Sequence, residues 1–340
     1  MTVSEQPGSQ IRNWRFWFAL IFTLCCLMLA VRGLDLSEVW RAFEHVRLGL
    51  LFISLGFALT NLFARAFRWK LLYSLKKDIS LQRAYSVMMI GLMVNAFTPV
   101  RLGELTRAFL LGEVEEESKV YTLGTVFVEK LLEMVMFVIS VVVLVFLATL
   151  PNWLLTPSQA LAITTVTLLP LVSLAIWQRD FLLTILNRFT TAISPTKGKW
   201  FMDKAYQALS SLQVLENPVL LIKLFLWSVV ILALAMLSFD FVFRAMGLTL
   251  PLWAALFVLV VMQAGVAIPS SPGSIGVFHY LAVLSLSVFN VEQGVAFSTG
   301  IILHLLIYLP MTILGTYFLW HENLAWKTLT SAVMRLGKGG

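Results

Sequence analysis

The chain has 340 residues, of which 59% are hydrophobic and only 13% are charged. Soluble domains average about 45–50% apolar and about 25% charged residues, so this composition excludes an ordinary soluble protein. The formal net charge is +7, but cytoplasmic loops give membrane proteins such a bias, and we expect no nucleic-acid partner. The two cysteines, Cys25 and Cys26, are adjacent, so they predict neither a disulfide framework nor a metal site.

Apolar runs long enough to cross a bilayer recur along the whole chain. A helix needs about 20 mainly apolar residues to cross the hydrocarbon core. The first run is preceded by Arg12 and Arg15, so a signal peptide is the alternative there; no small-residue cleavage site follows, which favours an uncleaved helix. The predicted spans are Phe16–Val31, Leu48–Ala64, Tyr121–Leu150, Ser158–Trp177, Val219–Phe239 and Val295–Trp320.

Two further apolar runs, Tyr85–Pro99 and Trp253–Pro269, are too short for a comfortable span. Each run leads directly into proline and glycine, which end or interrupt helices. We interpret both as re-entrant half-helices. The predicted fold is an all-α polytopic membrane protein with about six full spans and two re-entrant broken-helix hairpins, forming a single integral-membrane domain over residues 1–340.

The distribution of cations predicts the orientation. With the N-terminus inside, the inner segments carry seventeen Lys and Arg and the outer segments carry four. Cytoplasmic loops carry such an excess, so both termini are expected on the cytoplasmic side. The longest segment outside the predicted spans and re-entrant elements is Gln178–Asn217, which is too short for an ordinary catalytic domain.

The two halves of the chain share a pattern when the sequence is shifted by half its length. The first predicted repeat covers residues 48–150, with a re-entrant element at 85–111; the second covers 218–320, with one at 253–284. Inverted repeats with interrupted helices at matching positions indicate a substrate site near the membrane midplane. The punctuating residues that coincide are Pro99 with Pro269, Gly103 with Gly273, and Gly124 with Gly294.

The first break contains polar and charged residues from Asn95 to Arg107. Ionisable groups at membrane depth are costly and usually face a cavity or a partner. Glu104 and Arg107 are three residues apart and share a helix face, so one interpretation is an Arg–Glu cluster that neutralises itself. The other is that Arg101 and Arg107 bind a lipid phosphate, because guanidinium suits bidentate contact with phosphate.

The second break is rich in small residues. Free backbone N–H groups at the start of a half-helix form a concavity that binds anions. The alternative is a tight turn whose small residues let two backbones approach each other. A nucleotide-binding loop is not predicted, because the lysine and the preceding strand of that motif are missing. The candidate backbone contacts are Ser270, Ser271, Gly273, Ser274 and Gly276.

A third group of charges lies in the span after the first break. Glu129 and Glu133 are one helical turn apart and repel each other if both are ionised. We expect one of them to pair with Arg101, Arg107 or Lys130, or to take up a proton. A structural salt-bridge network and a role in gating or proton coupling, shared with Glu104, remain the two interpretations.

Two other polar groups are expected to be structural. His304 and Tyr308 are one turn apart in the last span and predict a packed polar pair rather than a ligand site. The acidic run Glu113–Glu117 is expected to be a solvated loop or helix start.

Three motifs resemble the transmembrane region of the lysylphosphatidylglycerol synthases, which defines a wider group of bacterial and archaeal proteins, the flippase-like domain family. They read Asn95…Pro99-x-Arg101-x-Gly103-Glu104-x-x-Arg107, then Glu129-Lys130-x-x-Glu133, then Pro269-x-x-Pro272-Gly273-x-x-Gly276-Val277. The resemblance covers essentially the whole chain, and it implies two inverted re-entrant elements, a bacterial or archaeal inner-membrane location and movement of a lipid headgroup between leaflets.

The chain departs from the family pattern at four positions. Lys130 stands where the family usually has arginine, and Glu133 where it usually has aspartate, so charge is kept at both. Ser274 replaces a more typical glycine. His279 replaces a more typical glutamate, which puts a coupling role for that position in doubt.

The resulting hypothesis is a lipid translocase for an anionic or zwitterionic lipid or lipid-linked headgroup. It implies membrane lipids as partners, no cofactor, no metal and no catalytic residue. Two alternatives stay open: an integral-membrane glycosyl- or aminoacyl-lipid transferase, with Glu104 and Glu129 as its acid–base pair, and a non-transporting partner of a separate lipid-modifying enzyme. The oligomeric state, the lipid, the direction and the energy source are not specified by the sequence.

Overall fold

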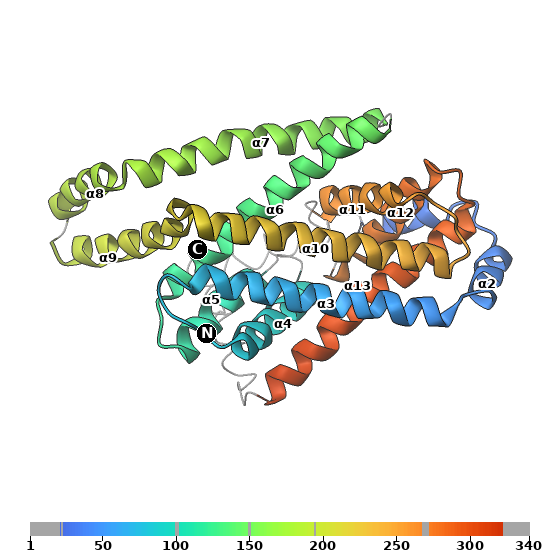
Figure 1. Ribbon diagram of the computed structural model, residues 1–340, viewed down its shortest axis with the longest axis horizontal. Coiled ribbons are helices and arrows are strands. Elements are labelled where there is room, and N and C mark those ends of the chain that lie inside the picture. Colours follow the sequence, from blue (N-terminus) through green and yellow to red (C-terminus); the bar gives the residue numbers. More distant parts are fainter. Residues whose placement is uncertain are drawn as a thin grey trace, which may run out of the picture. The chain divides into compact units, whose positions relative to one another are not determined.

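The computed structural model describes residues 21, 23–98, 102–148, 151–193, 195–266 and 272–321. Within these ranges every regular element is a helix (Figure 1). All are α-helices except two short 3-10 helices, η1 (Leu212–Glu216) and η2 (Pro272–Ser274). Five described helices are long and apolar enough to cross a membrane. The chain is therefore an all-helical, multi-pass membrane protein.

The five long helices confirm five of the six predicted spans. The first predicted run lies mostly outside the described residues, and its residues 23–31 are helical. The short helix α2 (Leu36–Glu44) follows it. The long helices are α3 (Leu48–Tyr73), α6 (Lys119–Leu147), α7 (Asn152–Trp177), α10 (Pro218–Ala245) and α13 (Gln293–His321).

Two pairs of shorter helices flank the predicted breaks. They are α4 (Leu81–Phe97) with α5 (Gly103–Val114), and α11 (Leu252–Val266) with α12 (Ile275–Ser287). At a rise of about 1.5 Å per residue, none of the four reaches across a hydrocarbon core about 30 Å thick. Both halves of the chain thus run long, short, short, long. Membrane re-entry and the inverted relation of the halves stay predictions.

Side-chain caps explain where several helices begin. The first N–H groups of a helix lack intrahelical partners, so a preceding oxygen acceptor stabilises the start. Asp35 accepts from the amide of Ser37 before α2, and Ser118 accepts from the amide of Tyr121 in α6. Asn217 accepts from the amide of Leu220 at 3.1 Å in α10.

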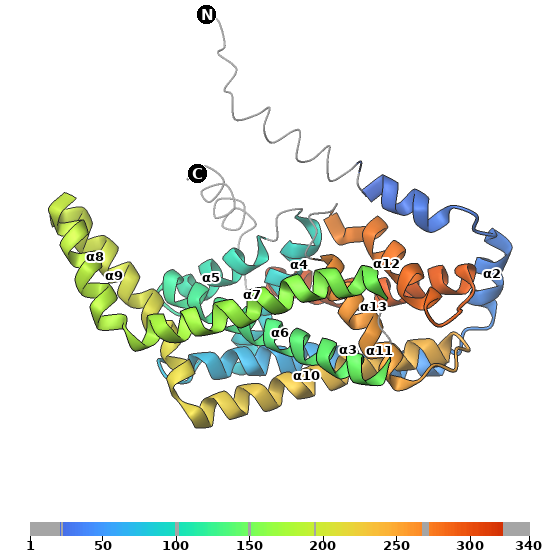
Figure 2. The same cartoon turned by 90° about the horizontal axis from the view of Figure 1, so that it is seen from above.

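The segment after α7 forms a helical hairpin. Helices α8 (Arg179–Ile193) and α9 (Pro195–Ser211) lie side by side in Figure 1 and again in Figure 2. Helix α9 also packs against α6. Gly124 of α6 permits this approach, because a Cβ there would overlap the hydroxyl oxygen of Ser211.

The chain divides into two compact units. The first contains Met1–Leu59, Leu92–Leu102 and Leu234–Ile313, and the second contains Thr60–Gly91, Gly103–Ala233 and Leu314–Gly340. In the first unit, the hydroxyl of Ser54 on α3 donates to the carbonyl of Ser238 on α10 at 2.7 Å. Its buried core includes Phe239, Val242, Phe243, Val258, Phe278 and Leu303.

The prediction that the acidic run Glu113–Glu117 is solvated is confirmed for Glu113, whose carboxylate is 56% exposed, and for Glu116, and is wrong for Glu115 and Glu117. Glu115 is largely buried and accepts from Lys77 Nζ at 2.8 Å and Arg83 Nη1 at 3.0 Å, while Glu117 pairs with Lys76 Nζ at 2.6 Å. Burial raises the pKa of Glu115, but the hydrogen bonds from Lys77 and Arg83 outweigh it, so the pKa lies below the ordinary glutamate value. The run therefore ties the α5–α6 turn to the α3–α4 connection.

Candidate functional site

Seven charged side chains gather within the second unit, and we call them the ion cluster. Three helices supply them, and all seven are linked by ion pairs of 3.7 Å or less. The members are Arg65 and Arg68 of α3, Glu104 and Arg107 of α5, and Glu129, Lys130 and Glu133 of α6. The cluster thus joins one flank of the first break to two bilayer-length helices.

Glu129 lies at the buried end of the ion cluster. Its side chain is 3% exposed and receives Arg107 Nη2 at 2.6 Å and Arg68 Nη2 at 3.6 Å. Both guanidinium groups are as deeply buried as the carboxylate. Removing one partner of such a buried pair leaves an uncompensated charge, so Glu129 and its two arginines hold α3, α5 and α6 together.

Glu133 lies one turn further along α6, at the rim of the cluster. Its Oε1 is 3.1 Å from Arg65 Nη1 and 3.4 Å from Arg68 Nη2, and its Oε2 is 2.9 Å from Lys130 Nζ. The carboxylate is 20% exposed, whereas Lys130 is 41% and Arg65 is 33% exposed. The rim of the cluster is therefore open to molecules outside the protein.

An aromatic ring and a glycine position Arg107. The guanidinium carbon lies 4.1 Å from the centre of the Trp69 ring, and the indole N–H of Trp69 donates to Thr125 Oγ1 at 3.2 Å. Gly91 of α4 makes room for this side chain, because a Cβ there would overlap Arg107 Cγ and lie 2.9 Å from the carbonyl oxygen of Gly103. Arg107 is thus enclosed between Trp69, α4 and Glu129.

The ion cluster contains more cations than anions. Four cationic side chains face three carboxylates, which leaves a net charge of +1 among the described members. The Nε atoms of Arg68 and Arg107 are buried and have no hydrogen-bond partner among the described residues. Buried donors without acceptors are unfavourable, and the net charge of +1 attracts anions to the exposed rim of the cluster electrostatically.

Sequence reasoning found one side of the cluster and missed the other. Arg107 pairs with Glu129 and Lys130 pairs with Glu133, two of the pairings considered above, whereas Glu104 pairs with Lys130 at 3.7 Å. Arg65 and Arg68 lie just beyond Ala64, the predicted end of the second span, so they are among the seventeen inner-segment cations rather than the predicted site residues. Their helical spacing from Asn61, at i+4 and i+7, is the signal that places them on one face of α3.

Other predicted residues lie elsewhere. Arg101, Ser270 and Ser271 fall outside the described residues. Asn95 is partly buried near the end of α4, in the first unit. Its neighbour Ala96 approaches the second break, since a Cβ on Gly273 would lie 4.0 Å from the Ala96 carbonyl oxygen.

The second break has left-handed backbone at two consecutive residues. Gly273 has φ 71° and Ser274 has φ 51°. Glycine adopts this region freely, while it is sparsely populated by residues with a Cβ. Ser274, which departs from the family's usual glycine, therefore occupies a conformation that suits glycine better.

His304 of α13 holds the second break. Its Nε2 donates to the carbonyl of Gly273 at 2.8 Å, and its ring stacks on Tyr308 at a centroid distance of 4.2 Å. The packed His304–Tyr308 pair is confirmed, and its contact with the break was not foreseen. His279 contacts the carbonyl of Ile275 through Nδ1 and lies 5.2 Å from the His304 ring.

Gly276 has a packing role, because a Cβ there would overlap the carbonyl oxygen of Thr23. We expect Gly276→Ala to lower the thermal unfolding midpoint of the detergent-purified protein, because backbone atoms of Thr23 cannot rotate away. Gly56→Ala is the matched control, since a Cβ at Gly56 meets nothing within 4 Å; it should raise stability by up to about 1 kcal/mol. Equal midpoints for the two variants would refute the close packing.

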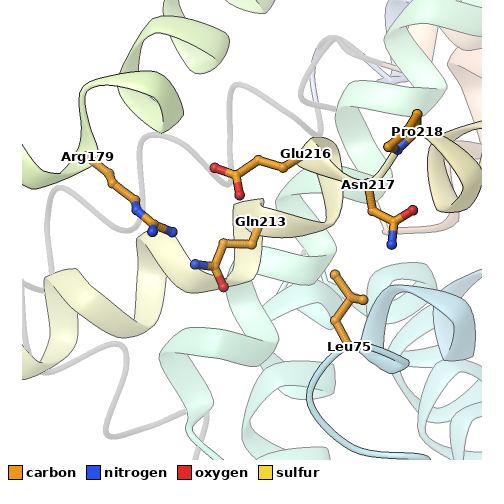
Figure 3. Close-up of a pocket in the computed structure, with 6 residues that line it drawn as sticks. All are labelled: Leu75, Arg179, Gln213, Glu216, Asn217 and Pro218. Atoms are coloured by element: carbon orange, nitrogen blue, oxygen red, sulfur yellow. The ribbon is translucent and has the colours of Figure 1, made fainter.

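The second unit also contains an open hollow of about 540 Å³. Leu75, Arg179, Gln213, Glu216, Asn217 and Pro218 line it (Figure 3). Figure 3 shows Arg179, Gln213 and Glu216 reaching toward a shared space. None of the predicted site residues lines this hollow, and the ion cluster remains the candidate site. Among the described residues, no group of three His, Cys, Asp or Glu is placed to hold a metal ion.

Comparisons with known proteins agree with the sequence motifs. The chain matches the family described as the lysylphosphatidylglycerol synthase TM region over residues 16–315. A UPF0104 membrane protein of Methanocaldococcus jannaschii is 23% identical over 225 residues, which are 66% of this chain and 92% of that protein. No solved structure matches the chain. The family match covers most of the sequence and both breaks, and the chain belongs to the lysylphosphatidylglycerol synthase transmembrane-region family.

Proposed function

We propose that this protein is a lipid translocase that moves an anionic or zwitterionic lipid, or a lipid-linked headgroup, between the leaflets of the inner membrane. In this proposal both termini are cytoplasmic and the short helix pairs re-enter the membrane. The observation that carries the proposal is the ion cluster, where four cations and three carboxylates from two bilayer-length helices and the short helix α5 meet.

The physical barrier to lipid exchange is desolvation of the headgroup. A phosphate that leaves water for hydrocarbon loses strong hydrogen bonds and is destabilised by several kcal/mol or more. The partly exposed side chains of Lys130 and Arg65 replace part of that hydration, and Arg101 is proposed to add a further cation from the first break. Backbone N–H groups near Gly273 are proposed as a second polar contact, as in transporters with interrupted helices.

The carboxylates of the cluster are proposed to gate the site. Glu104 and Glu133 share Lys130, at 3.7 Å and 2.9 Å, so a change in either pair alters the charge presented to a headgroup. Glu129 is enclosed by arginines and maintains the arrangement around them. A separate lipid-modifying enzyme is the proposed supplier of the transported lipid.

Vesicles that contain the purified protein and a fluorescent phosphatidylglycerol in both leaflets test the proposal. An impermeant quencher removes only the outer-leaflet signal, so protein-free vesicles lose half of it. Wild-type vesicles should lose clearly more than half, because inner-leaflet lipid reaches the quencher. Lys130→Gln and Arg101→Gln should return the loss toward half, whereas Lys223→Gln, the same change outside the cluster, should not.

Two controls make the vesicle result decisive. Each variant must elute as wild type does on size exclusion, which separates lost transport from lost fold. A fluorescent diacylglycerol, which has no phosphate, should exchange equally in all vesicles. If wild-type vesicles stop at half loss with anionic and zwitterionic lipids, with and without a proton gradient, the translocase proposal fails and the role of partner to another enzyme replaces it.

A further inference from the structure

The two glutamates of the ion cluster have different surroundings although they lie one turn apart on α6. Glu129 is 3% exposed and is closed in by Arg107 and Arg68. Glu133 is 20% exposed and contacts Arg65, Arg68 and Lys130. The first carboxylate is part of the buried framework, and the second lies at the partly exposed rim of the cluster.

Three cations surround the Glu133 carboxylate, and we call the space between them the Glu133 site. Arg65 and Arg68 approach one carboxylate oxygen at 3.1 Å and 3.4 Å, and Lys130 approaches the other at 2.9 Å. Two guanidinium groups and one ammonium are also the groups that bind phosphate oxygens in proteins. Glu133 therefore occupies a position suited to a phosphate group.

The carboxylate and a phosphodiester are similar in charge and shape, so replacing one by the other at the Glu133 site changes the free energy little. A phosphodiester carries one negative charge and two non-bridging oxygens, as a carboxylate does, so replacing one by the other leaves the cluster charge unchanged. Lys130 and Arg65 are exposed enough to meet an incoming headgroup. Arg68 lies beneath them at 1% exposure and contacts Glu133 through Nη2, so the same guanidinium N–H group can donate to a phosphate oxygen that takes the place of the carboxylate.

We propose that the Glu133 carboxylate is an internal substitute for the substrate phosphate. It occupies the Glu133 site until a phosphodiester monoanion displaces it. The inference rests on the proposed function, since it names the substrate group and the residue that regulates access to it. Displacement turns the Glu133 carboxylate outward, and return of the carboxylate expels the headgroup. The net charge of the bound ions at the Glu133 site is thus the same in both states.

Binding to the detergent-purified protein tests this inference without any transport step. The probes are dihexanoyl phosphatidylglycerol and, separately, inorganic phosphate, and the readout is the dissociation constant from a ligand-dependent thermal shift. Glu133→Gln should tighten phosphatidylglycerol binding by about tenfold, because the competing carboxylate is gone while its three cations remain. Adding Lys130→Gln to this variant should abolish the gain.

Glu104→Gln is the matched control, because it removes the same charge from the same cluster without vacating the Glu133 site. A gain of the same size in Glu104→Gln would show that net charge alone sets affinity and would overturn the inference. Glu133→Asp keeps the carboxylate on a side chain that is one methylene shorter, and it serves as a second variant if Glu133→Gln does not fold. It should tighten phosphatidylglycerol binding by less than Glu133→Gln does.

The two probes distinguish the source of the phosphate. A gain confined to phosphatidylglycerol identifies a lipid headgroup, and an equal gain with inorganic phosphate identifies the phosphate group alone. If a folded Glu133→Gln variant binds neither probe more tightly than wild type, the proposal that Glu133 occupies a phosphate site is refuted. Because the vesicle assay is separate, a protein that transports lipid without this gain disproves only the further inference.

Discussion

Replacement of Glu129 by glutamine is expected to lower the free energy of unfolding by about 3–5 kcal/mol, the range for removing one partner of a buried ion pair. The carboxylate is 3% exposed and lies 2.6 Å from Arg107 Nη2. Without it, Arg107 keeps a buried charge that no water can solvate. Thermal or denaturant unfolding of the purified protein in detergent measures the loss.

Glu113→Gln is the matched control for this prediction. Glu113 pairs with Lys119 at 2.7 Å, but the carboxylate is 56% exposed, and exposed pairs contribute about 0–1 kcal/mol. Combining Glu129→Gln with Arg107→Gln should cost less than Glu129→Gln alone, because the stranded cation is removed as well. If Glu129→Gln unfolds no earlier than Glu113→Gln, the buried pair does not hold α5 against α6.

The second large effect is expected for Trp69→Ala, at about 3–5 kcal/mol of lost stability, the range for truncating a core tryptophan. Trp69 is fully buried, and its ring faces the Arg107 guanidinium at 4.1 Å. The substitution leaves a cavity, removes the cation–π contact and leaves the buried Thr125 hydroxyl without the indole N–H. The unfolding midpoint in detergent should fall clearly.

Trp177→Ala tests whether the loss of stability depends on the burial of the tryptophan that is removed. Trp177 is 83% exposed, so its truncation should change the midpoint little. The unfolding midpoint of Trp69→Phe should lie between those of Trp69→Ala and Trp177→Ala, because phenylalanine keeps a ring under Arg107 and loses only the indole N–H and some volume. Equal losses at Trp69 and Trp177 would contradict a packed support beneath the cluster.

The helices were predictable because their signal is local. Apolar runs of bilayer length identify α3, α6, α7, α10 and α13, and the prolines and glycines at the breaks separate the short helices. The helix α3 continues to Tyr73, nine residues past Ala64, where the second predicted span ends. Arg65 and Arg68 interrupt the apolar run, and the carboxylates that neutralise them lie far away on α6. Hydropathy over one segment does not contain that pairing.

The site was predictable to the extent that its partners are close in sequence. The spacing of Glu129, Lys130 and Glu133 shows a charged face of one helix, and three-residue spacing links Glu104 with Arg107. Glu104 nevertheless pairs with Lys130. The contact between Gly276 and Thr23 joins segments about 250 residues apart, so the need for glycine there appears only in the folded chain.

The order of charges along the chain has a consequence for biogenesis. Arg68 precedes Glu133 by 65 residues, so the ribosome delivers the cations of α3 to the membrane before their counter-ions exist. A lone arginine at the centre of an inserting helix costs about 2.5–3.5 kcal/mol, but Arg65 and Arg68 lie in the last third of α3, from where a long side chain can reach the interface at a lower cost. We expect the end of α3 to stay near the interface until α6 emerges and its carboxylates pair with the two arginines. The final position of this end of α3 then depends on a later segment of the same nascent chain.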